Sequence, residues 1–473
     1  MTNDIEPSES NFLTETTGLI GKAHKSDLRG WAGLSILSLG IAGVFALLLA
    51  VSRIPGVEGV VPLPLDFFAK GLVIHVVFSF IVWFLGVFGA LLEIATVRVS
   101  RGDIRLGILG KLALAGGYIS TVLLFIPAFL NRGEATQNNY IPAITDPVYY
   151  AGLVILAGSL AIMAIRLLVN AIGREGRWKE PFSFGVFSAS MSYLIALVCF
   201  YIAFGRLEGQ ELSYDFNESL FWGGGHVLQF FNAILLILAL YALGRITLDV
   251  DEFADREVLL TAFSFLIIYS AVGILGTMKY APNHEKYWWL FTNLQYGLAF
   301  PTLLFAVPAF VSIRKTSQSI GFLPLRDPAF LCLLLSPLVF GVGGFLGFFV
   351  DGGDTRTPAH YHGVIAGINL SFMGLFYGLF LPLLGRTPKR SKPLYAQIYM
   401  FGGGQLLACI GLFLAGGYGA PRKTAGDAQG LEDLGAIVGM YMNGVGALIA
   451  VIGGVMFIWM MAKALLRNQP AAY

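Results

Sequence analysis

Long apolar runs dominate the chain, and short charged or Gly/Pro-containing connectors separate them. A helix needs about 20 apolar residues to cross the hydrocarbon core of a bilayer. Twelve runs reach this length, so the sequence predicts an all-α polytopic membrane protein with twelve transmembrane helices. The predicted helices cover residues 31–52, 70–96, 107–130, 147–171, 182–204, 217–244, 257–278, 288–312, 328–350, 359–384, 394–418 and 434–463.

No linker or change in composition divides these helices. We therefore predict an N-terminal tail over residues 1–30 and a single transmembrane domain over residues 31–466. Only 13% of the residues are charged and 56% are hydrophobic. A soluble globular chain has about 25% charged residues, so this class is excluded. The expected surroundings are a lipid bilayer, with no nucleic acid as partner.

The distribution of Lys and Arg predicts the orientation. With the N-terminus in the cytoplasm, 22 of the 31 Lys and Arg residues fall on the cytoplasmic side, as the positive-inside rule requires. An even number of helices places the C-terminus there too. The first residues lack the apolar core of a cleavable signal, so we expect them to be retained. The predicted location is the bacterial inner membrane.

Histidines supply the candidate chemistry. Of the six in the chain, His24 falls in the tail and is expected to be solvated. In the predicted topology the other five lie near the outer face: His75, His226, His284, His360 and His362. Ionisable residues inside a membrane are costly and usually functional, and imidazole is a common ligand of iron and copper. Several at one depth favour metal or cofactor binding over isolated hydrogen-bonded side chains.

The sequence Ala-His-Tyr-His adds a geometric constraint. Residues two apart on an α-helix point about 200° apart, because each residue turns the helix by about 100°. His360 and His362 therefore face opposite sides of the tenth helix and cannot both bind one metal. Two cofactors on opposite sides of that helix can use one histidine each. This spacing favours two tetrapyrroles that share the helix as a wall.

These histidines occur in an order that resembles a known family. The segments FFAKGLVIHVVFSF, FWGGGHVLQFFN and TPAHYHGVIAGINLSFMG lie on the second, sixth and tenth predicted helices. With the twelve helices, they resemble subunit I of haem-copper oxidases and the related nitric oxide reductases. The resemblance extends over essentially the whole chain and implies the same helical bundle.

The resemblance implies two haems and a role for each histidine. His75 and His362 would be the axial ligands of a six-coordinate, low-spin haem. His360 would be the proximal ligand of a high-spin haem that binds a small gas, O₂ or NO. His226 would contribute to a distal metal opposite this haem and belong to the catalytic site.

A basic pair follows the same resemblance. Arg422 and Lys423 lie in the outer connector between the last two helices, where the family keeps two basic residues. They would bind the haem propionates through charge-assisted hydrogen bonds. The alternative is that both are ordinary exposed charges of a loop.

The distal metal site departs from the family pattern. The family supplies two adjacent histidines from the seventh helix to a copper ion. Matching Pro301 to the family's usual proline places that pair near Gly276 and Thr277, which are not ligands. Copper prefers several nitrogen ligands, so copper or non-haem iron is doubtful here. A distal metal would require His284 to fold inward from its loop and bind beside His226.

The redox tyrosine and proton-transfer groups of the family are also hard to place. Phe230 stands four residues after His226, where many oxygen reductases have a tyrosine. Tyr269 on the seventh helix is the candidate that would replace it in catalysis. Glu93 is the only buried carboxylate that the sequence singles out, and its side chain could equally extend to the interface.

Electrons would have to come from outside this chain, since it has no copper-binding donor domain. The resemblance implies an electron-donating subunit, a cytochrome c or a quinol. The longest outer loops are expected near residues 205–216 and 419–433. The predicted function is that of a dihaem respiratory oxidoreductase subunit that reduces O₂. The alternatives are a nitric oxide reductase, a copper-lacking haem subunit for electron transfer or gas sensing, and a secondary transporter.

Overall fold

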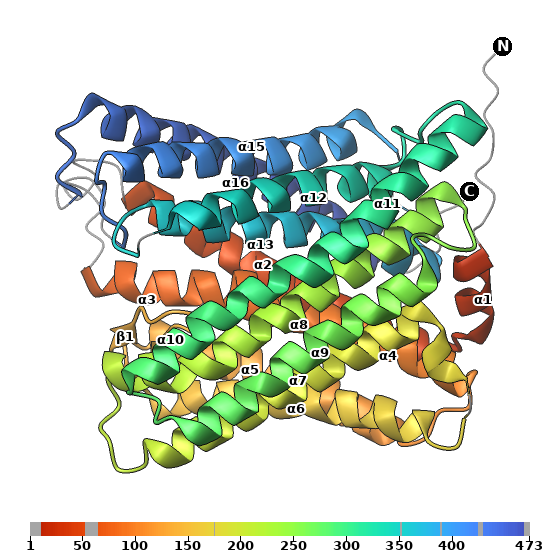
Figure 1. The fold of residues 1–473 in the computed structure, drawn as a ribbon, viewed down its shortest axis with the longest axis horizontal. Helices are drawn as coiled ribbons and strands as arrows, with labels where there is room; N and C mark the ends of the chain where they lie inside the picture. The colour runs from red at the N-terminus through yellow and green to blue at the C-terminus, as the bar shows by residue number, and fades with distance from the viewer. Residues whose placement is uncertain are drawn as a thin grey trace.

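A computed structural model describes residues 11–52, 65–174, 176–350, 352–387, 390–423 and 429–467. Within them, twelve helical spans are long and apolar enough to cross a bilayer, which confirms the predicted fold class. The spans run along one direction (Figure 1). We call one end of this bundle the α1 end, after the helix that lies across it. The opposite end, which carries the strands β1 and β2, is the hairpin end.

Most spans are single α-helices, and four are built from two or more helical segments. The α-helices are α1 (Asn11–Leu19), α2 (Lys22–Ser52), α3 (Leu65–Val76), α4 (Trp83–Ser100), α5 (Gly107–Phe129), α6 (Pro147–Ala171), α7 (Pro181–Arg206), α8 (Tyr214–Leu248), α9 (Arg256–Lys279), α10 (Glu285–Leu294), α11 (Ala299–Ile320), α12 (Pro328–Leu346), α13 (Arg356–Leu375), α14 (Leu381–Leu383), α15 (Lys392–Gly417) and α16 (Leu434–Leu466). The strands are β1 (Ala135–Thr136) and β2 (Ala143–Ile144), paired antiparallel.

Two π-helical segments interrupt the spans that carry His75 and the α13 histidines. Val77–Val82 joins α3 to α4 directly after His75, and Phe376–Phe380 joins α13 to α14. A π-helical turn widens the helix locally and is often found at functional sites. Further along the same span, the indole Nε1 of Trp83 donates to Oδ1 of Asn369 on α13 at 2.9 Å. The second and tenth spans are thus tied together.

The α1 end differs from the expected tail. Residues 11–19 form α1, which packs against α4, and α2 already begins at Lys22. The prediction that His24 is solvated was wrong, because its Nδ1 lies 2.7 Å from Oε1 of Glu93 and only 19% of its side chain is exposed. Glu93 does not extend to the interface: its side chain is fully buried. Nor is Glu93 the only such carboxylate, since Asp27 and Glu218 are buried as well.

The outer connectors also differ from the expectation. The segment between α5 and α6 is longer than the one between α7 and α8, and it folds into the β1–β2 hairpin. Apolar periodicity marked this segment only as a gap between helices. The hairpin brings Tyr140 over the bundle interior, although its backbone φ of +65° is unusual for a tyrosine.

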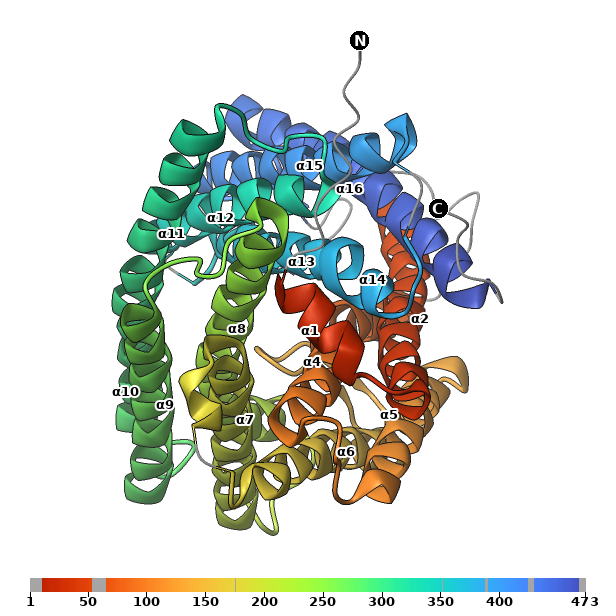
Figure 2. The same ribbon diagram turned by 90° about the vertical axis from the view of Figure 1, so that its right-hand side faces the viewer.

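The most buried spans contain the candidate ligands. Among the twelve, α8 and the span that includes α13 bury the largest share of their surface, and the α3–α4 span follows. Figure 2 looks along the helices and shows α4, α8 and α13 surrounded by the other spans. The helices α5, α11 and α16 lie at the periphery. The candidate ligands His75, His226, His360 and His362 are therefore on the three most buried spans.

Direct backbone contact holds α12 against α13. Gly343 and Gly363 face one another, and a Cβ at residue 343 would overlap the backbone of Gly363 and Val364. Small residues permit this close approach between membrane helices. The contact has a consequence for the site, because the Gly343 carbonyl oxygen reaches Nδ1 of His360.

We predict that Gly343→Ala destabilises the protein, whereas the neighbouring Gly344→Ala does not. A Cβ at residue 344 meets nothing within 4 Å, so Gly344→Ala is a matched control. Overpacking costs about 1–3 kcal/mol, and here the obstacle is backbone. Thermal unfolding in detergent should show a lower midpoint only for Gly343→Ala. Equal midpoints for the two variants would contradict the close contact.

Candidate functional site

His75 and His360 each point one ring nitrogen at a backbone carbonyl of a neighbouring helix. Nδ1 of His75 lies 3.0 Å from the Ala42 oxygen on α2, and Nδ1 of His360 lies 2.8 Å from the Gly343 oxygen on α12. A carbonyl oxygen only accepts, so Nδ1 carries the proton and the lone pair of the neutral ring is on Nε2. Metal-bound histidines usually donate their second N–H in this way. Both rings are therefore prepared to act as ligands through Nε2.

The two histidines of α13 differ in their surroundings. His360 is half-buried against α12, where a Cβ at Gly347 would lie 2.6 Å from its Nδ1. His362 is exposed, and its ring lies 5.1 Å from that of Tyr361. His362 is thus exposed although it lies on one of the most buried spans. A flat cofactor beside α13 could reach this ring.

His226 on α8 has hydrogen bonds at both ring nitrogens. Nδ1 lies 2.7 Å from the Trp222 carbonyl oxygen, and Nε2 lies 2.7 Å from the Tyr140 hydroxyl. Burial and, to a smaller extent, the Glu218 charge raise the pKa of Tyr140 far above its ordinary value. The phenol therefore keeps its proton and donates it to Nε2, while Nδ1–H donates to the carbonyl. In this arrangement the Nε2 lone pair, which a metal would need, already accepts the Tyr140 hydroxyl proton.

Three glycines before His226 allow this packing. A Cβ at Gly225 would lie 2.5 Å from Cβ of Tyr140, so the tyrosine sits directly against the α8 backbone. A Cβ at Gly223 or Gly224 would likewise clash with aromatic side chains from α10 and α7. Successive helical residues point in different directions, so each glycine admits a different neighbour. The run Gly-Gly-Gly-His is thus a small-residue patch that surrounds the histidine with aromatic rings.

The seventh span fills the position where the family pattern has copper ligands. A Cβ at Gly276 would lie 2.5 Å from Cδ2 of Leu290, so α10 occupies the room that a larger side chain would need. The Thr277 hydroxyl donates to the Gly273 oxygen at 2.8 Å. Neither position offers a nitrogen ligand toward His226.

His284 and Tyr269 occupy separate positions. His284 is exposed at the start of α10, where its Nδ1 accepts the Lys286 N–H at 3.1 Å. This role as a helix cap differs from that of a buried ligand beside His226. Tyr269 is half-buried and stacks on Phe230, with ring centroids 5.9 Å apart. Tyr269 is therefore next to Phe230, which follows His226 by one helical turn.

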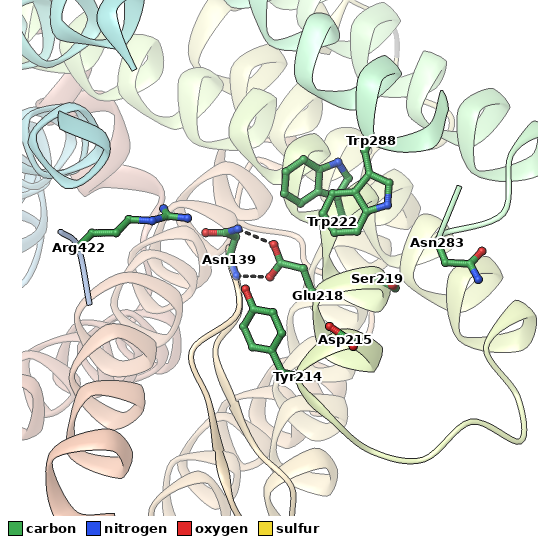
Figure 3. A pocket seen from close by; sticks show the side chains of 9 residues that line it. All are labelled: Asn139, Tyr214, Asp215, Glu218, Ser219, Trp222, Asn283, Trp288 and Arg422. Atoms are coloured by element: carbon green, nitrogen blue, oxygen red, sulfur yellow. Dashed lines mark hydrogen bonds between the residues drawn. The ribbon is translucent and has the colours of Figure 1, made fainter. Parts of the chain in front are cut away.

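A pocket of about 640 Å³ lies above this site at the hairpin end. Figure 3 shows Glu218 pointing at Asn139, with Trp222 and Trp288 beside it. The carboxylate accepts from the backbone and side-chain nitrogens of Asn139, which precedes Tyr140. Glu218 thus anchors the hairpin segment that carries the tyrosine. The ring centroids of Trp222 and Trp288 are 4.2 Å apart.

The predicted basic pair lies at the same end. Arg422 lines the pocket, and Nζ of Lys423 donates to the Gln137 oxygen at 2.5 Å. Desolvation and the adjacent Arg422 charge lower the pKa of Lys423, and the Glu218 charge opposes this shift. Arg422 is half-buried and Lys423 is exposed, and both contact the hairpin end of the bundle.

Tyr140 and Glu218 were missed from the sequence. Tyr140 lies in a connector whose contacts no helical periodicity can predict. Glu218 is near the start of its helix, where sequence alone does not separate a buried carboxylate from an interfacial one. The available signal was the triple glycine before His226, which indicates a close approach by some other segment.

Comparison with known proteins decides the family. The model of the family described as cytochrome c and quinol oxidase polypeptide I matches residues 29–456. The chain belongs to this family. The match includes all five of the histidines predicted near one face, and it confirms the resemblance inferred from three of the helices.

Relatives of this oxidase-family chain include two uncharacterised bacterial proteins. One, from Rickettsia prowazekii (strain Madrid E), is 27% identical over 94% of this chain and 97% of its own length. Another, from Aquifex aeolicus (strain VF5), is 28% identical over 76% of this chain and 86% of its own length. A solved haem-copper terminal oxidase dimer has the same fold, with a TM-score of 0.81 and 18% identity over 95% of this chain and 85% of that one.

Proteins of this oxidase family normally bind haem, and the donor set of this chain fits that group. His75 and His360 have the hydrogen-bonded Nδ1 of an axial ligand, and His362 is accessible beside α13. The donor set does not fit copper. Beside His226 the described residues offer one imidazole, whose Nε2 already accepts from Tyr140.

We predict that Tyr140→Phe lowers the stability of the protein and the exposed Tyr201→Phe does not. The change leaves the buried Nε2 of His226 without a donor, which costs about 1–3 kcal/mol. Tyr201 on α7 is 79% exposed and serves as the control. Thermal unfolding of both variants measures the difference. An unchanged midpoint for Tyr140→Phe would contradict the bond.

Proposed function

We propose that the chain is a dihaem respiratory oxidoreductase subunit. His75 and His362 hold a low-spin haem, and His360 holds a high-spin haem that binds a diatomic gas, O₂ in the first instance. The two haems would supply one-electron chemistry, and the histidines of α13 would hold one haem each. The observation that supports this most directly is the pair of histidines two residues apart on a central helix, because their side chains face opposite sides.

The haems supply the reversible one-electron chemistry and the gas-binding iron. The protein supplies ligands and a dry, fixed setting. The carbonyl oxygens of Ala42 and Gly343 fix the ring orientation of His75 and His360. The backbone contact between α12 and α13 keeps the second of these oxygens in place. These contacts hold the two ligands in position without a further metal.

Arg422 and Lys423 bind the haem propionates at the hairpin end. Both are close to the bundle there, and Glu218 lies within the same pocket as Arg422. An arginine can bind a carboxylate through two hydrogen bonds and a lysine through one point charge. The pair thereby fixes the edge of a haem and compensates its charge.

The α1 end lies in the cytoplasm and the hairpin end outside, in a bacterial inner membrane. The excess of Lys and Arg on the connectors of the α1 end supports this orientation. Electrons arrive from a donor subunit, a cytochrome c or a quinol. The chain itself would offer ligands for two haems to this transfer.

A second candidate function is favoured by the His226–Tyr140 bond. Complete reduction of O₂ requires four electrons, and a site without copper supplies fewer of them at once. A nitric oxide reductase or a copper-lacking haem subunit for electron transfer or gas sensing would need no copper. Consumption of O₂ or NO by the reduced protein with an added donor separates these functions.

We predict distinct spectral losses for the two kinds of ligand. In the wild type, two imidazole ligands should exclude CO from the low-spin iron, so CO binds only the haem on His360. His75→Ala should abolish the low-spin spectrum and leave this CO-binding haem. His360→Ala should remove CO binding and leave the low-spin spectrum.

The matched control is His284→Ala, whose exposed imidazole caps α10. It should retain both signals. The assignment of His75 is wrong if the low-spin spectrum survives its loss, and that of His360 is wrong if CO still binds.

A further inference from the structure

A cluster of charged side chains is buried near the α1 end, far from the candidate haem ligands. Nδ1 of His24 lies 2.7 Å from Oε1 of Glu93, and Nη1 of Arg166 lies 2.6 Å from Oε2 of the same carboxylate. Glu93 and Arg166 are fully buried, and Asp27 is 7% exposed. Three spans, which contain α2, α4 and α6, contribute to it.

The cluster has unequal charge when His24 is neutral. Two carboxylates then face one guanidinium, which leaves a surplus negative charge in a medium where unpaired charge is costly. The remaining charge that acts on Asp27 is the ammonium of Lys111 on α5, an exposed side chain. One proton added to His24 makes the four buried groups neutral in sum.

Arg166 carries the second observation. Its Nε and Nη2 are buried, and neither has a hydrogen-bond acceptor within the part of the chain that the structure describes. Buried guanidinium N–H groups are nearly always hydrogen-bonded, and internal water is their usual partner when side chains are not. The α5 backbone permits this position of Arg166, because a Cβ at Gly110 would lie 2.6 Å from its Nη1.

His24 connects this cluster to the aqueous phase. Its side chain is 19% exposed, whereas the Glu93 side chain behind it is completely buried. Imidazole is the side chain that changes charge near neutral pH. Protonation at Nε2 forms one N–H bond and leaves the Nδ1–H donated to Glu93.

We propose that His24, Asp27, Glu93 and Arg166 form a proton-binding site that exchanges with the aqueous phase at the α1 end. His24 takes up and releases the proton, and Glu93 holds its ring in place. The site does not depend on whether the chain reduces a gas.

A metal ion is the competing occupant. Ligand atoms of His24, Asp27 and Glu93 lie within 4.8 Å of one another. Arg166 already holds one oxygen of Glu93, and its positive charge would repel a cation. The geometry therefore favours a proton.

Infrared difference spectroscopy of the full-length holoprotein with ¹³C-labelled histidine rings tests the proposal. Between about pH 5 and 8 an imidazole changes its charge. The wild-type spectra should contain a pH-dependent histidine band that the His24→Gln spectra lack. His284→Gln, which changes an exposed histidine, should retain that signal. His24→Gln keeps a side-chain N–H for Glu93, so folding should be preserved, which the unfolding midpoint checks.

Two outcomes would overturn the proposal. Identical pH-dependent spectra for wild type and His24→Gln would make the cluster a fixed ion network. Binding of one Zn²⁺ per chain, measured by titration calorimetry and lost in His24→Gln, would make it a metal site. If His24→Gln does not fold, the wild-type spectra recorded with and without Zn²⁺ decide. The proton site is then contradicted if the spectra show no signal of a buried histidine ring bonded to Glu93. It is also contradicted if Zn²⁺ removes that signal.

Discussion

The turn of the α-helix constrains the rest of this site. Residues 360 and 362 cannot face the same side of α13, so two imidazoles at this spacing serve two separate positions. The neighbouring helices are arranged accordingly. The α12 backbone meets α13 at Gly343 and orients His360, and α2 orients His75 on the other inner span through the Ala42 carbonyl. Backbone carbonyl oxygens of neighbouring helices thus set the orientation of both rings.

The distal side follows a different principle. His226 is held by a carbonyl oxygen on its own helix and by the Tyr140 hydroxyl from the hairpin segment. A triple glycine makes room for that tyrosine, and Glu218 anchors the residue before it. The family fold is therefore preserved, while a hydrogen-bonded aromatic pair occupies the surroundings of the histidine. Under the proposed function, the same bundle would keep its haem ligands and differ in chemistry beside His226.

The sequence was sufficient for features that depend on helical periodicity and length. It predicted the twelve spans and placed His75, His226 and His360 on the second, sixth and tenth, which the structure shows to be the most buried. It failed where contacts come from connectors or from helix ends. Tyr140 reaches His226 from a hairpin that was read as a gap, and His24 was assigned to a solvated tail although α2 begins before it. Pairing between Glu93 and Arg166 joins helices far apart in sequence, so no local pattern reports it.

Metal and haem stoichiometry of the purified protein tests the central claim most directly. Iron and copper per chain, measured beside pyridine haemochrome spectra, should give two haem irons and no copper, because α13 offers two separate axial ligands and His226 is already hydrogen-bonded. One haem per chain would contradict the use of opposite faces of α13. One copper per chain, lost in His284→Ala, would contradict the account of His226 and restore a conventional distal metal.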